Sequence, residues 1–329
     1  QLRMRVVLWQ GCDIWRLTFM YEPVMQTLAQ GFAAGGAHVA TGCIRNPDAV
    51  ANMTWLHSWV QRGDFFAWIG PIGSYHVAWG RLRELGVHTV HYKTEPVPLN
   101  ATKSKCMFNR HIKENWEYSM LNYAESMRCA NASANAPRPR YVPPGAYRHA
   151  IVNASAPSSA SPVLLFLGNP YEGGRHKCYG ELSRRLVRFG AMLTYTYKAF
   201  GEEAFGQRLS QRATVCVNLH KKCGARAALE AVRVAQVMSF GDCLVLSERA
   251  HALDESSYEG IVRFADNVSD IAAAFARLVE DGGRWRSEAA AAAHRFRRTF
   301  APTAIFRRAG VYRAFGLEDP VRPDSLLVG

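Results

Sequence analysis

The chain has 329 residues, 48% of them hydrophobic and 20% charged, and its formal net charge is +13. A chain of this length and composition is expected to fold into two globular domains, which excludes an intrinsically disordered protein. The positive charge favours an anionic partner, but there is no zinc-finger spacing and no RNA-binding aromatic segment, so we do not expect nucleic acid.

The first half of the chain alternates short β-branched or aromatic runs with amphipathic stretches of helical length. Strands are expected at "RVVLW", "HVATGCI", "DFFAWIG" and "VHTVHYK", with helices at 22–36, around 49–61 and at 75–86. This alternation predicts right-handed βαβ crossovers and a parallel sheet. A helix over 114–127, "ENWEYSMLNYAESM", and a short strand at "RYVPPG" are expected to complete this half.

A segment at 148–161, "RHAIVNASAPSSAS", is small and polar without periodicity, which is typical of a linker. After it the alternation restarts, with strands expected at "PVLLFLGN", "MLTYTY", "ATVCVNLH", "CLVLSE" and "IVRFA". Helices separate these runs, and the tail from 285 to 316 is expected to be helical. The fold class predicted is α/β, with two Rossmann-like lobes whose parallel sheets face each other across a cleft.

Polar side chains end two of the apolar runs in the second half of the chain, and others begin the helix between those runs. Ligands of parallel α/β sheets bind outside the carboxyl ends of the strands, and helix N-termini attract anions. Each residue alone is explained equally well by capping a turn, but together they predict a site for an anionic ligand. These residues are Asn218, His220, Glu230, Arg233, Ser247 and Glu248.

A glycine-rich loop, "LGNPYEGGRHKCYG", follows the first strand of the second half. Its Gly168, Asn169 and Gly-Gly pair allow a ligand to approach the backbone closely, and Arg175 and Lys177 add positive charge. The loop matches neither a dinucleotide fingerprint nor a Walker A motif, and a loop with solvated charges is an equal alternative. Arg226, near the start of a later helix, is a second candidate for binding phosphate.

The order and spacing of these motifs resemble GT-B glycosyltransferases, most closely a loosely defined group-1-like set found in microbes, algae and large viruses. That set has Asn-x-His, Leu-Glu-x-x-Arg, an apolar strand ending in Ser-Glu, and Leu-Asp followed by an aromatic residue. The corresponding residues here are Asn218 to His220, Leu229 to Arg233, Leu246 to Glu248, and Leu253 and Asp254 with Tyr258. Glu95 in "YKTEP", the segment Trp116–Asn122 and "YVPPGAY" are similar to further elements, although "YKTEP" lacks the usual Asn and Gln.

The resemblance implies a hexosyl or pentosyl transferase that moves a sugar from a nucleotide-sugar donor, with a UDP- or GDP-sugar expected, to a hydroxyl of a glycan, glycoprotein or small molecule. It also implies that Glu230 binds the ribose hydroxyls, although the helix dipole alone explains a carboxylate at a helix start. No Asp-x-Asp pair ends a strand, and the basic residues can stabilise a leaving phosphate, so neither a metal nor a cofactor is expected.

An inverting transferase needs a catalytic base, which the resemblance places in the N-terminal lobe. Asp13, His76 and Glu95 each follow an expected strand there. Asp13 would equally be a helix N-cap, and His76 would equally pack on aromatic residues. The three remain alternatives, and a retaining transferase needs no dedicated base.

The implied domains are an N-terminal acceptor domain over 1–150, a linker over 151–161, a C-terminal donor domain over 162–303, and a helix over 304–329 that returns to the N-terminal lobe. Two other functions stay open, a catalytically degenerate nucleotide-sugar-binding protein and a sugar-nucleotide epimerase. Turnover distinguishes them, since the first only binds and the second needs no acceptor.

Five Asn-x-Ser/Thr sequons favour a glycoprotein of the secretory pathway, resident in the Golgi or ER lumen, with the cytoplasm as the alternative. They begin at Asn52, Asn100, Asn131, Asn153 and Asn267, and Asn267 is also an expected helix N-cap. The eight cysteines contain no Cys-x-x-Cys pair, which disfavours zinc, and Cys106 with Cys129 is a candidate disulfide. The chain starts directly in a strand, so we expect contact with a membrane only through a removed N-terminal anchor.

Overall fold

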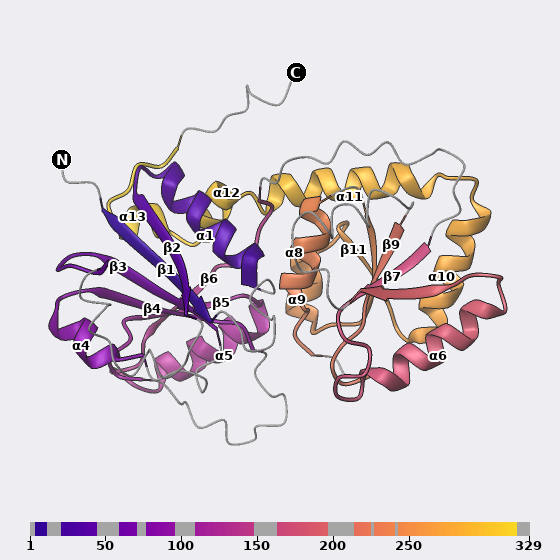
Figure 1. Cartoon of the computed structure of the whole chain (residues 1–329), viewed down its shortest axis with the longest axis horizontal. Coiled ribbons are helices and arrows are strands. Elements are labelled where there is room, and N and C mark those ends of the chain that lie inside the picture. Colours follow the sequence, from indigo (N-terminus) through magenta and orange to yellow (C-terminus); the bar gives the residue numbers. More distant parts are fainter. Residues whose placement is uncertain are drawn as a thin grey trace.

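The structure, a computed structural model, describes residues 4–11, 21–44, 59–70, 77–95, 109–147, 163–196, 214–224, 227–240 and 243–320. They form an N-lobe and a C-lobe, each built on one parallel sheet with helices against it (Figure 1). The two-lobe α/β fold expected from the sequence is confirmed. The predicted linker, residues 151–161, lies outside the described residues.

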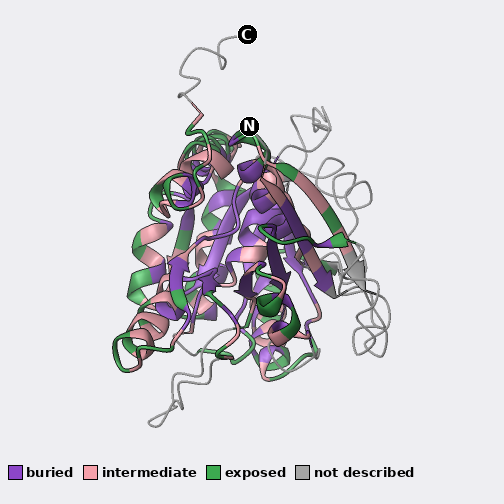
Figure 2. Ribbon diagram, turned by 90° about the vertical axis from the view of Figure 1, so that its left-hand side faces the viewer, coloured by how far each residue is buried: buried purple, intermediate pink, exposed green. Residues whose placement is uncertain are grey.

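The N-lobe sheet has the strand order β2-β1-β3-β4-β5-β6, with every neighbouring pair parallel. Successive side chains of β1 point to opposite faces, so Leu8 packs in the core under α1 while Val7 packs in a second core under α4. Both faces of the central strands β1, β3 and β4 are therefore buried, whereas the edge strand β2 is partly exposed (Figure 2). The elements are β1 Arg5–Gly11, α1 Glu22–Ala34, β2 His38–Ile44, β3 Phe65–Ile69, α4 Trp79–Glu84, β4 His88–Lys93, β5 Glu114–Glu117, α5 Met120–Asn131 and β6 Arg138–Tyr141.

The helix expected over 114–127 is wrong in its first turn, because Glu114–Glu117 forms β5 and the helix α5 begins only at Met120. The side chain of Trp116 is fully buried in this strand. Arg140 on the neighbouring β6 donates to both carboxylate oxygens of Glu114, at 2.6 and 2.9 Å. Packing and this cross-strand ion pair outweigh the helical preference of the local sequence.

The C-lobe sheet has the strand order β11-β10-β9-β7-β8, again parallel throughout. Alternate side chains of its strands pack under α6 and α10 on one face and against α8 and α11 on the other. The elements are β7 Val163–Leu167, α6 Arg175–Val187, β8 Leu193–Thr196, β9 Thr214–Asn218, α8 Ala231–Phe240, β10 Leu244–Glu248, α9 Ala252–Ser257, β11 Val262–Ala265, α10 Val268–Glu280 and α11 Trp285–Thr299.

The tail that follows α11 packs on the N-lobe as two short helices, α12 Pro302–Arg308 and α13 Val311–Ala314 (Figure 1). Gly310, with φ 66°, breaks what the sequence predicted as one continuous helical stretch. The ring of Phe306 lies 4.8 Å from the ring of Phe32 in α1. A Cβ at Gly31 would lie 2.6 Å from Phe306, so this close approach requires glycine.

His91 in β4 provides a pH-dependent test of the N-lobe core. Its side chain is 1% exposed, and its Nε2 lies 2.8 Å from the Gly70 carbonyl oxygen. Burial lowers the pKa of His91 to about 4, the Gly70 bond opposes this, and Lys93 lowers the pKa further. The histidine is therefore neutral in the fold and gains a proton on unfolding between pH 6.5 and 4, so stability falls as the pH falls through this window.

Replacing His91 with glutamine should remove the proton that the parent takes up at this position on unfolding. We expect the slope of unfolding free energy against pH, measured by urea titration between pH 6 and 5, to decrease by roughly 1.4 kcal/mol per pH unit. An unchanged slope in His91→Gln would contradict the buried neutral histidine.

Candidate functional site

The predicted polar residues at the ends of β9 and β10 lie side by side. Asn218 is aligned with Ser247 in the parallel register, and both side chains are buried. Asn218 Nδ2 donates to Ser247 Oγ at 3.0 Å, and Ser247 Oγ donates to the Glu248 carbonyl oxygen at 2.8 Å. These bonds hold the two strand ends together at the carboxyl edge of the C-lobe sheet.

Glu230 lies at this edge between two arginines, and we call Arg175, Glu230 and Arg233 the arginine–glutamate cluster. Arg175 Nη2 lies 2.9 Å from Glu230 Oε1, and Arg233 Nη2 lies 2.5 Å from Glu230 Oε2. The side chain of Glu230 is 28% exposed, against 4% for Arg175 and 12% for Arg233. Of the three, the carboxylate is thus the most accessible to a ligand.

The charge on Glu230 is set by its two neighbours. Burial raises the pKa of Glu230, but the charges of Arg233 and Arg175, with the hydrogen bond from Arg175, outweigh burial and hold the pKa below its usual range. The ring of Phe166 lies under both guanidinium groups, at 5.4 Å from Arg175 Cζ and 5.1 Å from Arg233 Cζ. Glu230 is therefore an ionised acceptor at neutral pH, held in place by its surroundings.

Glu230 also differs from its sequence-based placement, because α8 begins at Ala231 and not before it. The amides of Arg233 and Val234 donate to the Glu230 carbonyl oxygen at 3.0 and 3.2 Å. Glu230 thus occupies the position immediately before the helix instead of a place in its first turns. The expected strand–helix geometry, with the carboxylate near the positive helix end, is retained.

The glycine-rich loop after β7 folds against this cluster. Gly168 has φ 139°, and a Cβ there would lie 3.4 Å from Arg233 Nη2. Gly173 has φ 63°, and a Cβ there would lie 3.0 Å from the Lys221 carbonyl oxygen. Positive φ and this close approach both favour glycine, so the loop brings its backbone close to the site.

Arg175 supports this loop as well as Glu230. Its Nη1 donates to the Asn169 carbonyl oxygen at 3.1 Å, and its Nε donates to the Leu219 carbonyl oxygen at 3.2 Å. Lys177 in α6 and Lys221 and Lys222 in the loop after β9 are exposed, and Lys221 Nζ lies 2.7 Å from Glu172 Oε1. The lysines, more than Arg175, present charge to solvent at this edge.

A disulfide that the sequence did not indicate links the loop 219–224 after β9 to α6. Cys223 in this loop is bonded to Cys178 in α6, with the two Cα atoms 5.5 Å apart. Glu248 lies beneath and accepts from the amides of His220 at 2.8 Å and Gly224 at 3.0 Å. Cys178 Sγ lies 3.1 Å from Glu248 Oε1, a contact without a thiol proton because the sulfur is in the disulfide.

His220 has one ring nitrogen engaged and one available. Nε2 lies 3.0 Å from the Arg249 carbonyl oxygen, which fixes Nε2 as the protonated nitrogen. Nδ1 is buried without a hydrogen-bond partner and, in this tautomer, carries a lone pair. Such a nitrogen can accept a hydrogen bond from a ligand hydroxyl.

From the N-lobe, Glu95 faces the arginine–glutamate cluster. The residue is exposed overall, yet partial burial of its carboxyl group raises the pKa of Glu95; Lys221 opposes this, and Glu230 and Glu172 raise the pKa further. Asn122 Nδ2 donates to the Glu95 carbonyl oxygen at 2.9 Å. The other predicted residues Asp13, His76 and Arg226 lie outside the described residues.

A second polar pair, which the sequence did not indicate, lies beside Glu95 at the carboxyl ends of β4 and β5. Lys93 Nζ lies 2.7 Å from Glu117 Oε1, and Ser126 Oγ donates to the same oxygen. Burial raises the pKa of the fully buried Glu117, while Lys93 and the hydrogen bond from Ser126 lower it. Because the Glu117 side chain is fully buried, this pair joins the ends of β4 and β5 and is not open to a ligand.

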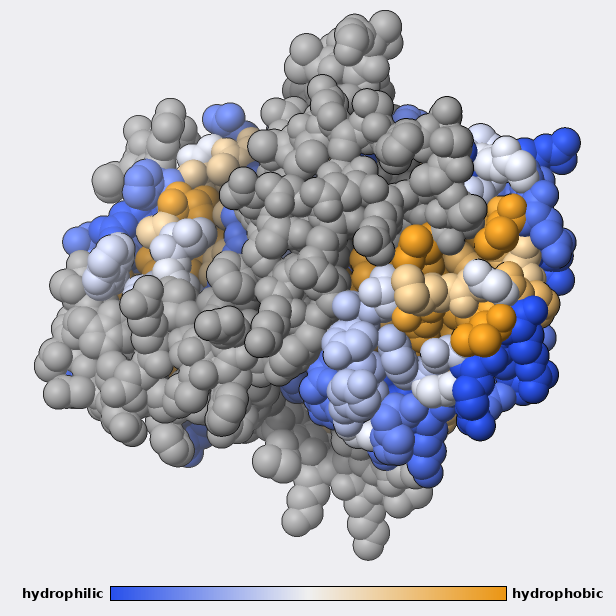
Figure 3. All heavy atoms as spheres, turned by 45° about the vertical axis from the view of Figure 1, so that its right-hand side comes forward, coloured by the Kyte–Doolittle hydropathy of each residue, from blue (hydrophilic) through white to orange (hydrophobic). Residues whose placement is uncertain are grey.

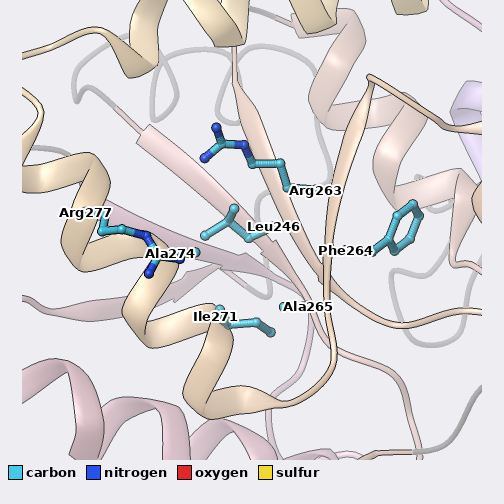
Figure 4. Close-up of a pocket in the computed structure, with 7 residues that line it drawn as sticks. All are labelled: Leu246, Arg263, Phe264, Ala265, Ile271, Ala274 and Arg277. Carbon is cyan, nitrogen blue, oxygen red and sulfur yellow. The ribbon is translucent and has the colours of Figure 1, made fainter.

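Within the described ranges, one group of side chains is close enough to share a metal ion: Cys178, Cys223 and Glu248. The disulfide uses both sulfurs, so no thiolate is left for a metal. A cavity of about 500 Å³ also lies in the C-lobe, between β10, β11 and α10 (Figure 4). Its lining residues are Leu246, Arg263, Phe264, Ala265, Ile271, Ala274 and Arg277.

This cavity brings two arginines next to apolar side chains and contains none of the predicted site residues (Figure 4). Arg263 Nη2 is engaged with Glu288 Oε2 at 2.5 Å. One face of the C-lobe also shows hydrophobic side chains bordered by hydrophilic ones (Figure 3). The residues that line the cavity include no carboxylate, histidine, cysteine or hydroxyl group, so the candidate site is the region around Glu230 and Glu95.

No protein-family model and no curated protein matches the chain. Among solved structures it is similar to Anabaena HepE in complex with UDP, at 10% identity and a TM-score of 0.56, covering 94% of this chain and 100% of that one. A glycosyltransferase from Rickettsia africae gives 8% identity and 0.57, covering 96% and 99%. The N-terminal domain of Candida albicans trehalose-6-phosphate phosphatase gives 8% and 0.55, covering 96% and 98%. At these identities the likeness shows the fold, which is GT-B.

Proposed function

We propose that the protein is a glycosyltransferase that moves a sugar from a nucleotide-sugar donor to a hydroxyl acceptor. The observation that carries the proposal is the ionised Glu230, held by Arg175 and Arg233 at the carboxyl edge of the C-lobe and facing Glu95 of the N-lobe. HepE, which has the same fold, is known in complexes with UDP and with UDP-glucose, which supports a nucleotide sugar as the ligand here.

In this proposal the C-lobe binds the donor. Glu230 accepts hydrogen bonds from the two ribose hydroxyls, which are strong because the acceptor is charged. The backbone of the glycine-rich loop, with Lys177, Lys221 and Arg233, faces the diphosphate and stabilises the charge that develops on it as the glycosidic bond breaks. His220 Nδ1 accepts a hydroxyl of the donor sugar, which gives its unpartnered nitrogen a ligand.

Glu95 is the catalytic base in the inverting version of the proposal. Its carboxylate lies on the N-lobe side of the cleft, and its raised pKa brings its proton affinity closer to that needed at neutral pH. Asp13 and His76 remain the alternative candidates for this base, on the basis of the sequence. The acceptor is a glycan or a protein, and hexosyl and pentosyl donors are both compatible with the site.

The donor role can be tested by a thermal-shift screen with UDP-, GDP-, ADP- and CMP-sugars. We expect at least one nucleotide sugar to raise the melting temperature of the parent, because a ligand that binds only the folded state stabilises it. The matching nucleoside should raise the melting temperature less, since it lacks the diphosphate that the lysines are proposed to face. A chain that none of these compounds stabilises would contradict the proposal.

Leaving-group stabilisation by Lys177, Lys221 and Arg233 predicts catalysis without a metal ion. Sugar transfer, or donor hydrolysis in the absence of an acceptor, should therefore continue at the parent rate in the presence of EDTA. Nucleoside diphosphate release, followed by a coupled assay, measures this rate. A loss of activity in EDTA that Mg²⁺ or Mn²⁺ restores would overturn the metal-independent mechanism.

We also propose residence in the lumen of the secretory pathway, in the Golgi or the ER. The Cys178–Cys223 disulfide and the disulfide-bonded Cys129 support an oxidising compartment; Cys106, the expected partner of Cys129, lies outside the described residues. Within the described part of the chain, no helix is long and apolar enough to cross a membrane.

Two sequons lie in described segments and differ in their surroundings. Asn131 is exposed at the end of α5, whereas Asn267 caps α10, accepting from the Asp270 amide at 3.0 Å, as the sequence predicted. In a secretory host we expect endoglycosidase treatment to lower the mass of the product, and Asn131→Gln to reduce that mass change. A secreted product whose mass endoglycosidase leaves unchanged would favour the cytoplasmic alternative.

A further inference from the structure

Asp254 forms hydrogen bonds to both lobes through one buried carboxylate. It lies in α9 of the C-lobe and is 1% exposed. Its Oδ2 accepts from the Leu229 amide of the C-lobe at 3.0 Å. Its Oδ1 accepts from the N-lobe amides of Met120 at 2.7 Å and Leu121 at 3.4 Å.

On the N-lobe side, Asp254 bonds the start of α5. The first amides of a helix have no partner within the helix, and the N-cap Ser119 satisfies only that of Asn122, at 3.0 Å. Asp254 provides the acceptor for the two amides that remain, and its negative charge suits the positive helix end. Asn122 then donates its side-chain amide to the Glu95 carbonyl oxygen, so the bonds continue to Glu95.

On the C-lobe side, Asp254 bonds the residue directly before Glu230. The Leu229 amide is held at 3.0 Å, and Leu229 is itself fully buried. Burial raises the pKa of Asp254, while the three backbone bonds lower it. The carboxylate is therefore hydrogen-bonded to the backbone next to Glu230 in the C-lobe and to the start of α5 in the N-lobe, whose Asn122 bonds Glu95.

We propose that Asp254 is a positioning residue that sets Glu95 of the N-lobe against Glu230 of the C-lobe, so that acceptor and donor meet in register. This inference rests on the proposed function. Glu230 has independent contacts with Arg175 and Arg233, so binding of the nucleotide does not depend on Asp254. The alignment of the two lobes at the cleft does depend on it, because Asp254 connects them directly.

The test compares Asp254→Asn with the parent in the full chain. The asparagine keeps the size of the side chain, but its amide nitrogen cannot accept, so the bond to one lobe is lost. Hydrogen exchange should become about tenfold faster in whichever peptide loses its acceptor, either 118–123 or the one that contains Leu229, as expected for the loss of one such bond. Calorimetry should give an unchanged UDP affinity, whereas kcat for UDP-glucose should fall by about tenfold to a hundredfold because the reacting groups are misplaced.

Glu255→Gln is the matched control, because Glu255 lies in the same helix and bonds only C-lobe groups, the Ala250 amide and Arg249, both at 2.9 Å. It should keep parent exchange in both peptides and parent turnover. If Asp254→Asn loses UDP affinity and kcat to the same extent, Asp254 has a structural role and no positioning role. Unchanged hydrogen exchange in the variant would also contradict the positioning role. If the parent is active and Asp254→Asn is equally active, only the positioning role is contradicted. If the parent turns over no nucleotide sugar, both the proposed function and the positioning role are contradicted.

Discussion

Replacing both Cys178 and Cys223 with alanine is expected to lower the free energy of unfolding by about 4 kcal/mol. The disulfide closes a chain segment with a sequence separation of 45, and the entropy that it removes from the unfolded chain gives this magnitude. Denaturant titration of the double variant and the parent, both without reductant, measures the difference. Equal stability of the two proteins would contradict a stabilising disulfide.

The same double variant should also bind the nucleotide more weakly, because the disulfide holds the loop 219–224 that carries His220 and Lys221. Other contacts also hold this loop. The Gly174 amide donates to the Lys221 carbonyl oxygen at 3.0 Å, and Lys221 Nζ lies 2.7 Å from Glu172 Oε1. Cys129→Ala is the control: it removes a disulfide in the N-lobe and should leave nucleotide affinity unchanged. A double variant with parent affinity would mean that the loop does not contact the ligand.

Glu230→Gln is expected to weaken nucleotide binding by about 1.5–3 kcal/mol, roughly tenfold to a hundredfold. The amide offers one acceptor where the carboxylate offers two, and the charge that strengthens both ribose bonds is lost. Calorimetry with UDP, or with whichever nucleotide the thermal-shift screen identifies, gives the affinity. Unchanged affinity would contradict the ribose-binding role and leave Glu230 only the structural role of pairing with Arg175 and Arg233.

The same change should lower stability by more than the 0.3–1 kcal/mol that its place at a helix start predicts. Arg175 and Arg233 would lose their shared counter-charge in a partly buried site, so we expect a cost on the order of 1–3 kcal/mol. Glu181→Gln is the matched control, since Glu181 pairs with Arg184 and Arg185 on the exposed side of α6 and should change both stability and affinity little. A Glu230→Gln variant as stable as this control would contradict the burial of the cluster.

The sequence predicted most strands of the two sheets from their apolar runs, and the central strands are buried on both faces. The runs that end at Asn218 and Glu248 became β9 and β10, with their polar ends adjacent as expected. The same reasoning failed at Glu114–Glu117, where polar residues form a strand because Arg140, distant in sequence, satisfies Glu114. Local preference therefore misled where the stabilising partner came from another strand.

The connections of the candidate site were beyond sequence reasoning for the same reason. Cys178 and Cys223 are separated by 45 positions with no spacing that indicates a pair. The bond from Asp254 to Met120 joins residues 134 positions apart, and only the packing of the two lobes brings them together. Lys221 was not singled out from the sequence, because its charge acts on Glu95 only once the chain is folded.

Release of nucleoside diphosphate from a nucleotide sugar tests the central claim most directly. The parent is incubated with the nucleotide sugar that stabilises it best, in the absence of any acceptor, and nucleoside diphosphate and free sugar are quantified by chromatography. The proposed transferase should release both in equal amounts by slow hydrolysis, and release should be lost in Glu95→Gln if Glu95 is the base. Binding without release would identify a nucleotide-sugar-binding protein, and a changed sugar still attached to its nucleotide would identify an epimerase; either result would contradict the account.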